Sequence, residues 1–302
     1  MSEERARAGQ AGQSTIEWIA LLLLVSLLVL GVLAAAGAGL PATGLARTIA
    51  TRLICAAGLS DRCAVEPELV AAYGPELAGR VAENAPEVIY ERGMTALPVD
   101  FRSCRGSRCG NGPNSGAVWS SSAGEPAAAF VHVVDCRDDR ARAKSTAHGF
   151  DCTGGRVGNL YVQYWLYYED STSLRDLPGD AGFHQDDWEG YQVRIGPAGT
   201  EARATSHHGY NYRGGPGSWL SDAGIIHRSA WGRSLGHLYV SGGSHAGHVD
   251  EDRHGSAPRW TPADRLELIP IETLDRSARR ARFAIVPPWR KPVYRDPEDE
   301  GT

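Results

Sequence analysis

The segment from Phe183 to Glu189 carries the side chains of this chain that are best suited to chemistry. It places His184, Asp187 and Glu189 in an H-x-x-D-x-E spacing, with Trp188 between the two carboxylates. If the segment is a strand, Asp187 and Glu189 project from one face, because side chains alternate along a strand. Two such carboxylates repel each other unless a cation or a proton neutralises them. The spacing therefore predicts a divalent metal site, whose ion could be Ca²⁺, Mg²⁺ or Mn²⁺.

Other polar side chains could line the same site. Ser244 and His245 follow two glycines at the end of an expected strand, where the backbone can approach a ligand closely. His208 could point toward the same cavity, and Asp186 lies inside the first motif. The alternative is that the acidic run is a solvated loop, that the histidines are ordinary polar residues and that Trp188 belongs to the core.

An apolar run from Trp18 to Ala36 is interrupted by a single polar residue, Ser26. It is long enough to cross a hydrocarbon core of about 30 Å as a helix. We expect a leader over residues 1–12, a transmembrane helix over 13–40, and a short helical stalk or linker over 41–80. A cleaved secretory signal is the alternative. The orientation that we favour places the bulk of the chain outside the cytoplasm, as a single-pass protein of the cell membrane.

Six cysteines support an oxidising compartment. Their even number and their arrangement as near neighbours predict disulfides between Cys55 and Cys63, Cys104 and Cys109, and Cys136 and Cys152. The pairing rests on proximity alone, since six cysteines allow fifteen pairings. Zinc ligation is the alternative, but the chain has no C-x-x-C pair.

Composition predicts an all-β domain, a β-sandwich, over residues 81–289. The chain has 302 residues, of which 42% are hydrophobic, and this is enough for a good-sized core. Its 36 glycines and 17 prolines indicate many turns, as in an antiparallel β protein. Its net charge of −5 and its lack of a long basic run argue against nucleic acid as a partner. Residues 290–302 read as an acidic tail. The strand-like segments are 88–90, 128–134, 160–168, 191–195, 202–206 and 238–240.

Four segments in a fixed order resemble the vacuolar protein sorting-associated family with H-x-G-D-W-E and G-S-H-A motifs. They are Tyr161–Tyr168, His184–Glu189, His207–Gly209 and Leu238–Ala246. They are more distantly similar to the necrosis- and ethylene-inducing peptide-like cytolysins, whose hallmark is G-H-R-H-D-W-E. The chain departs from the cytolysin pattern at Asp186, where that family has histidine, and at the inserted Phe183.

The cytolysin resemblance implies a β-sandwich with a divalent cation in an acidic surface cavity, where the cation helps to recognise a sugar headgroup on a membrane lipid. Carried over by residue, it implies the ligands His184, Asp187 and Glu189. It also implies an upstream aspartate, for which Asp176 has suitable spacing and Asp170 and Asp180 compete.

The N-terminus has its own resemblance. The run from Gly12 to Glu17, directly before the apolar segment, resembles the processing site of type IV prepilins and of the pilin-like proteins of tight-adherence systems. This implies cleavage after Gly12 and a helix that stays in the membrane.

Three functions follow as hypotheses. The first is a membrane-anchored module that uses a metal to bind a glycan or lipid headgroup. The second is a metal-dependent hydrolase of glycans or phosphoesters, with His245 or Asp186 as general base. Gly243–Gly247 spells G-S-H-A-G and is not a nucleophile elbow. The third is a minor-pilin-like structural protein that meets pilin-like assembly machinery. We favour the first, which is a binding protein and not an enzyme.

Overall fold

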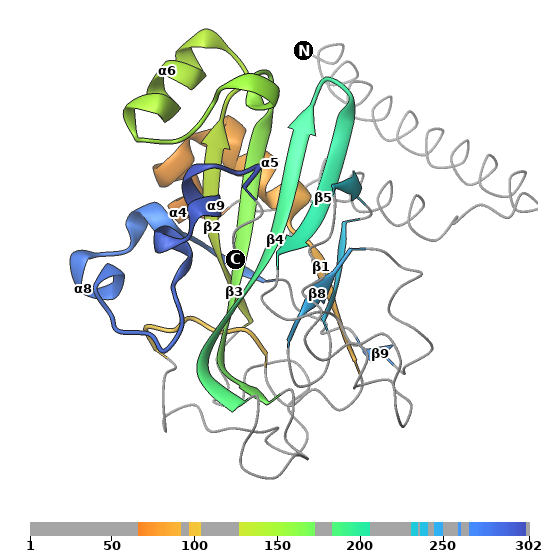
Figure 1. The fold of residues 1–302 in the computed structure, drawn as a ribbon, viewed down its shortest axis with the longest axis vertical. Helices are drawn as coiled ribbons and strands as arrows, with labels where there is room; N and C mark the ends of the chain where they lie inside the picture. The colour runs from red at the N-terminus through yellow and green to blue at the C-terminus, as the bar shows by residue number, and fades with distance from the viewer. Residues whose placement is uncertain are drawn as a thin grey trace, which may run out of the picture. The chain divides into compact units, whose positions relative to one another are not determined.

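Two mixed β-sheets form the framework of the computed structural model (Figure 1). The structure describes residues 66–91, 97–103, 127–172, 183–205, 231–234, 236–240, 245–249, 259–260 and 266–299. All of them belong to a compact unit that runs from Val65 to Thr302. The expected leader and transmembrane helix lie outside the described residues, and within those residues no helix is long and apolar enough to cross a membrane.

The larger sheet has six strands in the order β10-β2-β3-β4-β5-β6. Their bounds are β10 Glu267–Pro270, β2 Ala128–Asp135, β3 Leu160–Thr172, β4 Phe183–Gly196, β5 Gly199–Thr205 and β6 Gly232–Arg233. The smaller sheet, in the order β8-β7-β1-β9, contains β8 Gly247–His248, β7 His237–Val240, β1 Glu87–Glu91 and β9 Arg259–Trp260. The expectation of a β-rich domain is therefore confirmed.

The strand directions differ from the expected antiparallel pattern in two places. β1 pairs with β7 in parallel, and β10 pairs with β2 in parallel. The remaining described pairings are antiparallel. Parallel neighbours need long connections, and both pairs here join strands that lie far apart in the chain.

Short helices lie between and beside the strands. The α-helices are α4 Pro67–Tyr73, α5 Pro75–Asn84, α6 Asp139–Ala147, α8 Arg276–Arg279 and α9 Pro292–Arg295. The 3₁₀ turns are η3 Gly154–Arg156, η5 Ile271–Thr273 and η6 Pro288–Arg290. Proline at the first position of α4 and α5 fits a helix start, where the missing N–H has no intrahelical partner.

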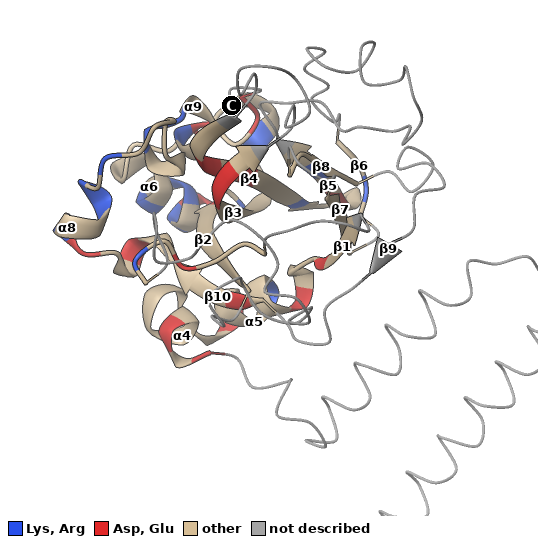
Figure 2. Ribbon diagram, turned by 90° about the horizontal axis from the view of Figure 1, so that it is seen from below, with Lys and Arg blue, Asp and Glu red and all other residues tan. Residues whose placement is uncertain are grey.

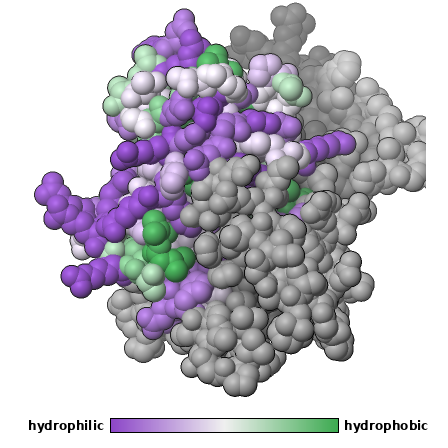
Figure 3. Space-filling model, in the orientation of Figure 1, coloured by the Kyte–Doolittle hydropathy of each residue, from purple (hydrophilic) through white to green (hydrophobic). Residues whose placement is uncertain are grey.

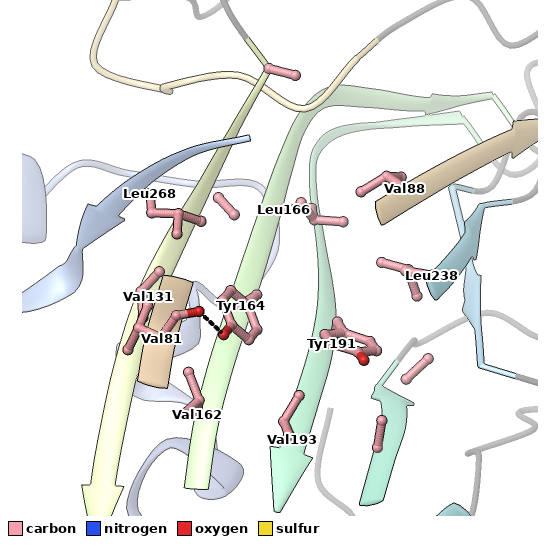
Figure 4. Close-up of a cluster of buried hydrophobic side chains, with 14 of the residues drawn as sticks. Val81, Val88, Val131, Val162, Tyr164, Leu166, Tyr191, Val193, Leu238 and Leu268 are labelled. Atoms are coloured by element: carbon pink, nitrogen blue, oxygen red, sulfur yellow. Dashed lines mark hydrogen bonds between the residues drawn. The ribbon is translucent and has the colours of Figure 1, made fainter. Parts of the chain in front are cut away.

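Both sheets contribute to one hydrophobic core (Figure 4). Tyr164 and Leu166 of the large sheet and Val88 and Leu238 of the small sheet belong to the same buried cluster. The two sheets approach closely at Gly247 of β8. A Cβ atom at this position would lie 3.3 Å from the Cβ of Ala204 in β5 and 2.8 Å from a methyl carbon of Leu238 in β7.

Helices α4 and α5 belong to this core. They include the part of the expected stalk, residues 41–80, that the structure describes. Leu69, Ala78 and Val81 are fully buried in the first cluster. The hydroxyl of Tyr164 donates a hydrogen bond of 2.6 Å to the carbonyl of Val81 (Figure 4). The compact unit that begins at Val65 therefore contains every described hydrophobic core.

A second core covers the other face of the large sheet. Trp165 and Trp188 pack there with Phe101 and Phe130, and residues of the C-terminal segment, such as Ile271 and Val293, close it. The rings of Phe101 and Phe130 have centroids 5.0 Å apart. Such aromatic pairs add specific contacts to their large buried area.

A disulfide joins Cys136 and Cys152, as expected, with their Cα atoms 5.3 Å apart. Both residues are buried beside Val134 and Tyr161. The expected pairs Cys55–Cys63 and Cys104–Cys109 lie outside the described residues. The observed bridge is typical of an oxidising compartment.

The C-terminal segment is not a free acidic tail as far as residue 299. Arg203 donates to the carbonyls of Pro297 and Asp299, at 2.7 and 2.8 Å. The carboxylate of Glu298 accepts hydrogen bonds from Tyr161 and Trp231. These contacts hold the acidic residues against strands β3 to β5.

Candidate functional site

The first motif lies on β4, and its two carboxylates share a face as predicted. Asp187 and Glu189 alternate with Trp188 and follow the side of β4 that sends Tyr191 and Val193 into the first core. Asp187 is 3% exposed and Glu189 is 1% exposed. Carboxylates this deeply buried require compensation by hydrogen bonds, by a partner charge or by a metal.

His245 supplies part of that compensation to Asp187. Its Nδ1 atom lies 3.0 Å from Oδ2 of Asp187, although the two residues are 58 positions apart. The imidazole stacks on the ring of Tyr168, with centroids 4.1 Å apart and an angle of 11°. The two motifs singled out in the sequence therefore meet at one buried point. The carboxylate fixes the orientation of the ring and the position of its Nδ1 proton.

The backbone of His245 is unusual, because its φ is +55°. A non-glycine residue in this left-handed region costs of order 1 kcal/mol or more and persists when its surroundings hold it there. The bond to Asp187 and the stack on Tyr168 are those surroundings. Strain of this kind concentrates at functional positions.

Two buried tyrosines complete this side of the site. Burial raises the pKa of Tyr168 well above its usual value, and the neighbouring Tyr90, Glu189 and Asp187 raise it further. Burial likewise raises the pKa of Tyr90. Both hydroxyls therefore stay protonated at neutral pH and can donate hydrogen bonds to acceptors in this acidic region.

Asp186 points to the opposite face of the strand from Asp187. One carboxylate oxygen accepts from the hydroxyl of Tyr167 at 2.7 Å, and the other accepts from the backbone N–H of Ala284 at 2.6 Å. Its φ of +59° marks a local break in the regular strand. We expected Asp186 to line a ligand site. In the structure its hydrogen bond with Ala284 links the C-terminal segment to β4.

His184 is only partly buried, and its Nδ1 lies 3.1 Å from the carbonyl oxygen of Asp186. A carbonyl only accepts, so Nδ1 carries the proton of this bond. In the neutral ring the lone pair then resides on Nε2, which is the atom that would face a metal ion.

The neighbouring strand adds two more acids to this end of the hairpin. Asp170 of β3 is 6% exposed, and alternation places it on the same face as Tyr168, next to Asp187. Of the three aspartates considered as upstream ligands, Asp170 is thus the one that the structure describes. Burial raises the pKa of Glu169, and the charges of Asp170 and Asp186 raise it further. No spacing or motif in the sequence singles out Glu169.

A buried lysine lies on the reverse side of the sheet. Lys291 is 7% exposed, and its Nζ atom is 5.4 Å from the centroid of the Trp165 ring. Burial lowers the pKa of Lys291, while the charges of Glu189 and Asp187 act in the opposite direction. One hint was available in the sequence, since Lys291 is one of only two lysines in the chain.

The donor set suits a hard divalent cation in its chemistry, with carboxylates from β3 and β4 and one imidazole. Within the described residues, however, no three His, Cys, Asp or Glu side chains come close enough together to hold a metal ion. Further ligands would have to come from elsewhere. Asp176 lies in the undescribed segment 173–182, directly between β3 and β4. The other expected site and processing residues, His208, Ser244, Gly12 and Glu17, are also outside the described part.

Comparison with known proteins gives limited information. No family model and no curated protein sequence matches the chain. A solved structure described as "Toxin fold for microbial attack and plant defense" is similar with a TM-score of 0.32 and 14% identity, over 70% of this chain and 82% of that chain. Another, described as "NLPPya in complex with glucosamine", has a TM-score of 0.31 and 17% identity, over 72% and 81%. These values show a weak structural similarity, and the expected vacuolar sorting and pilin-like relationships stay predictions.

Proposed function

We propose that this chain is a membrane-anchored, extracytoplasmic β-sandwich protein that binds a divalent metal ion and, through it, a glycan or lipid headgroup. The observation that carries the proposal is the buried group on one face of β4. Asp187 and Glu189 project together into it, and His245 reaches Asp187 from a distant segment at 3.0 Å.

The charge of this group supports a cation. Asp170, Asp187 and Glu189 are all less than a tenth exposed. The basic side chains described near them are the imidazole of His245, at 3.0 Å from Asp187, and Lys291 behind the sheet. A divalent ion bound by Asp187 and Glu189 would offset the remaining charge. Its further ligands would come from beyond the described residues, with Asp176 as the candidate, because no three described His, Cys, Asp or Glu side chains lie close enough together to hold an ion. When bound, such an ion supplies open coordination positions for hydroxyl or phosphate oxygens.

The first experiment measures metal content and melting temperature of the Val65–Thr302 fragment, with and without chelator. Asp187→Asn removes a proposed ligand, and Asp186→Asn is the matched control on the opposite face. We expect a stoichiometric divalent ion in the wild type and in Asp186→Asn, and its loss in Asp187→Asn. If no metal is bound, and added Ca²⁺, Mg²⁺ or Mn²⁺ leaves the melting temperature unchanged, the metal proposal is wrong. A bound ion would justify a glycan screen in which binding must disappear with chelator.

One observation favours a second candidate, a hydrolase. A carboxylate that orients one ring nitrogen of a histidine leaves the other to act as general base, and Asp187 and His245 have this arrangement. Turnover on a panel of glycans and phosphoesters that is lost in His245→Asn would favour it. Asp186 is a weaker candidate for the base, because both of its oxygens accept hydrogen bonds within the fold.

A role in pilin-like assembly rests on the segment around Gly12 and Glu17. It is compatible with the binding function, since the anchor and the domain could serve different partners. Loss of filament association in Glu17→Ala, with an unchanged amount of membrane-bound protein, would support it.

A further inference from the structure

The segment from α8 to α9 is strongly basic. Residues 276–295 contain six arginines and Lys291 but no aspartate or glutamate, in a chain whose net charge is −5. In Figure 2 the ribbon is blue, the colour of Lys and Arg, at several places along α8 and the stretch that leads from it to α9. This segment therefore carries positive side chains without an acidic residue between them.

Several of these charges have no ion-pair partner among the residues that the structure describes. Arg276, Arg280 and Arg290 are exposed, and none of them forms an ion pair with another described residue. Six other described arginines do form ion pairs, namely Arg80, Arg102, Arg137, Arg142, Arg156 and Arg194. Three guanidinium groups on one surface are therefore available to an anionic partner.

An apolar strip crosses this basic surface. Phe283 and Ile285 pack inward on the second core, whereas Ala284 and Val286 between and after them are exposed. Val286 is 53% exposed, the highest value among the large hydrophobic side chains described. Figure 3 shows a small green patch bordered by hydrophilic side chains on the side where α8 lies in Figure 1.

We propose that this surface, made of Arg276, Arg280, Arg290, Ala284 and Val286, docks onto an anionic lipid bilayer. Guanidinium groups beside exposed apolar side chains fit the boundary between phosphate headgroups and acyl chains. Duplex nucleic acid would also attract the arginines, but its phosphate backbone offers no apolar partner for Val286. Charge complementarity and the apolar strip together therefore favour the bilayer.

The docking surface is fastened to the candidate site. The backbone N–H of Ala284 donates to Asp186, whose neighbour in the chain is Asp187. Docking would thus hold the acidic end of the β3–β4 hairpin near lipid headgroups. The inference itself does not depend on a bound metal, because none of its residues belongs to the proposed ligands.

Co-sedimentation of the Val65–Thr302 fragment with vesicles tests the inference. The vesicles are either phosphatidylcholine alone or equal parts of phosphatidylcholine and phosphatidylglycerol, and chelator is present throughout. We expect binding only to the anionic vesicles, and weaker binding at high salt. The triple substitution Arg276→Gln, Arg280→Gln and Arg290→Gln should lower the partition coefficient by about fivefold for each arginine, and so by about a hundredfold in all.

The matched control removes three exposed basic residues from elsewhere, Arg140, Lys144 and Arg233, also to glutamine. It should lose much less binding, and Val286→Ser should weaken binding with the arginines intact. Equal loss in the two triple variants, no binding to anionic vesicles, or an unchanged Val286→Ser would each overturn the inference. Tighter binding to a DNA duplex than to vesicles would assign the surface to nucleic acid instead. Because chelator is present, failure of the metal proposal cannot mimic any of these outcomes.

Discussion

The Nδ1 atom of His132 lies 2.7 Å from Oε1 of Glu272. The Nε2 atom of the same ring lies 3.2 Å from the carbonyl oxygen of Tyr294. Both partners are acceptors, so the ring satisfies both contacts only when each nitrogen carries a proton. His132 is fully buried and stacks on the ring of Tyr294, at 3.8 Å between centroids. This ion pair therefore joins β2 to the C-terminal segment.

Glu272→Gln should change how the free energy of unfolding depends on pH in the acidic range. Burial acts to raise the pKa of Glu272, but hydrogen bonds and charge from His132, with a further bond from Tyr73, lower it overall. A carboxyl group whose pKa is lowered by folding stabilises the protein above its unfolded pKa, and this contribution disappears as pH falls through the folded pKa. Because the Glu272 side chain is 35% exposed, solvent screening limits the effect to about 1 kcal/mol.

The measurement is the free energy of urea unfolding between neutral and acidic pH. The wild type should lose more stability than Glu272→Gln as the pH falls toward and below the usual range of a glutamate carboxyl group. Parallel curves for the two proteins would contradict the assignment.

The contact between Asp187 and His245 should appear as a coupling energy. Asp187→Asn and His245→Asn each leave a buried polar partner, and asparagine tolerates the positive φ at position 245. We expect a double-mutant cycle to give about 1–3 kcal/mol of coupling in chelator. The control cycle pairs Asp186→Asn with His245→Asn and should give less than about 0.5 kcal/mol, because Asp186 faces the other way. Similar coupling in both cycles would mean that the buried group responds to any change on β4.

The disulfide should contribute to stability in proportion to the loop that it closes. Cys136 and Cys152 are 16 residues apart, which corresponds to about 3 kcal/mol in the chain-entropy account. The double substitution Cys136→Ser and Cys152→Ser should therefore lower the free energy of unfolding by that amount. A reductant should lower the melting temperature of the wild type more than that of the double variant, which keeps the expected Cys104–Cys109 pair. Equal sensitivity in the two proteins would point to a different bridge.

The sequence was a good guide where a pattern is local. The aromatic and β-branched residues of Tyr161–Tyr168 predicted a strand there. Alternation predicted the shared face of Asp187 and Glu189, because side chains follow a period of two in a strand. Proximity along the chain predicted the Cys136–Cys152 bridge. Asp186 departs from its expected role because its positive φ breaks the regular strand, which spacing does not reveal.

Relationships across long separations were beyond such patterns. Nothing in the spacing of Ser244 and His245 specifies that the imidazole reaches Asp187, because that contact depends on how β7 and β8 pack against β4. Likewise, the Ala-rich helical spacing of the segment that contains α4 and most of α5 predicted a stalk, and such spacing does not show what a helix packs against. Leu69 and Ala78 are nevertheless fully buried in the first hydrophobic core, among residues of the strands. The acidic residues 296–300 were expected to be solvated, because the sequence alone does not show that Arg194 of β4 and Arg203 of β5 contact this segment.

Glu298→Ala should destabilise the domain although it lies four residues from the end of the chain. Burial acts to raise the pKa of Glu298, but hydrogen bonds from Tyr161, Arg194 and Trp231 lower it overall. The substitution leaves these donors without their acceptor, at an expected cost of about 1–3 kcal/mol. The indole of Trp231 also lies between two guanidinium groups, at 4.6 Å from Arg194 and 4.5 Å from Arg203.

Urea unfolding followed by tryptophan fluorescence measures this effect and reports on Trp231 as well. Glu83→Ala is the control, because Glu83 forms a surface ion pair of 3.9 Å with Arg80 and is 53% exposed. Its loss should change the free energy of unfolding by less than about 0.5 kcal/mol. If Glu298→Ala is as mild as Glu83→Ala, the C-terminal residues behave as a solvated tail in solution. A large loss would show that the last turn of the chain holds β3, β4 and β5 together at the end of the sheet away from the candidate site.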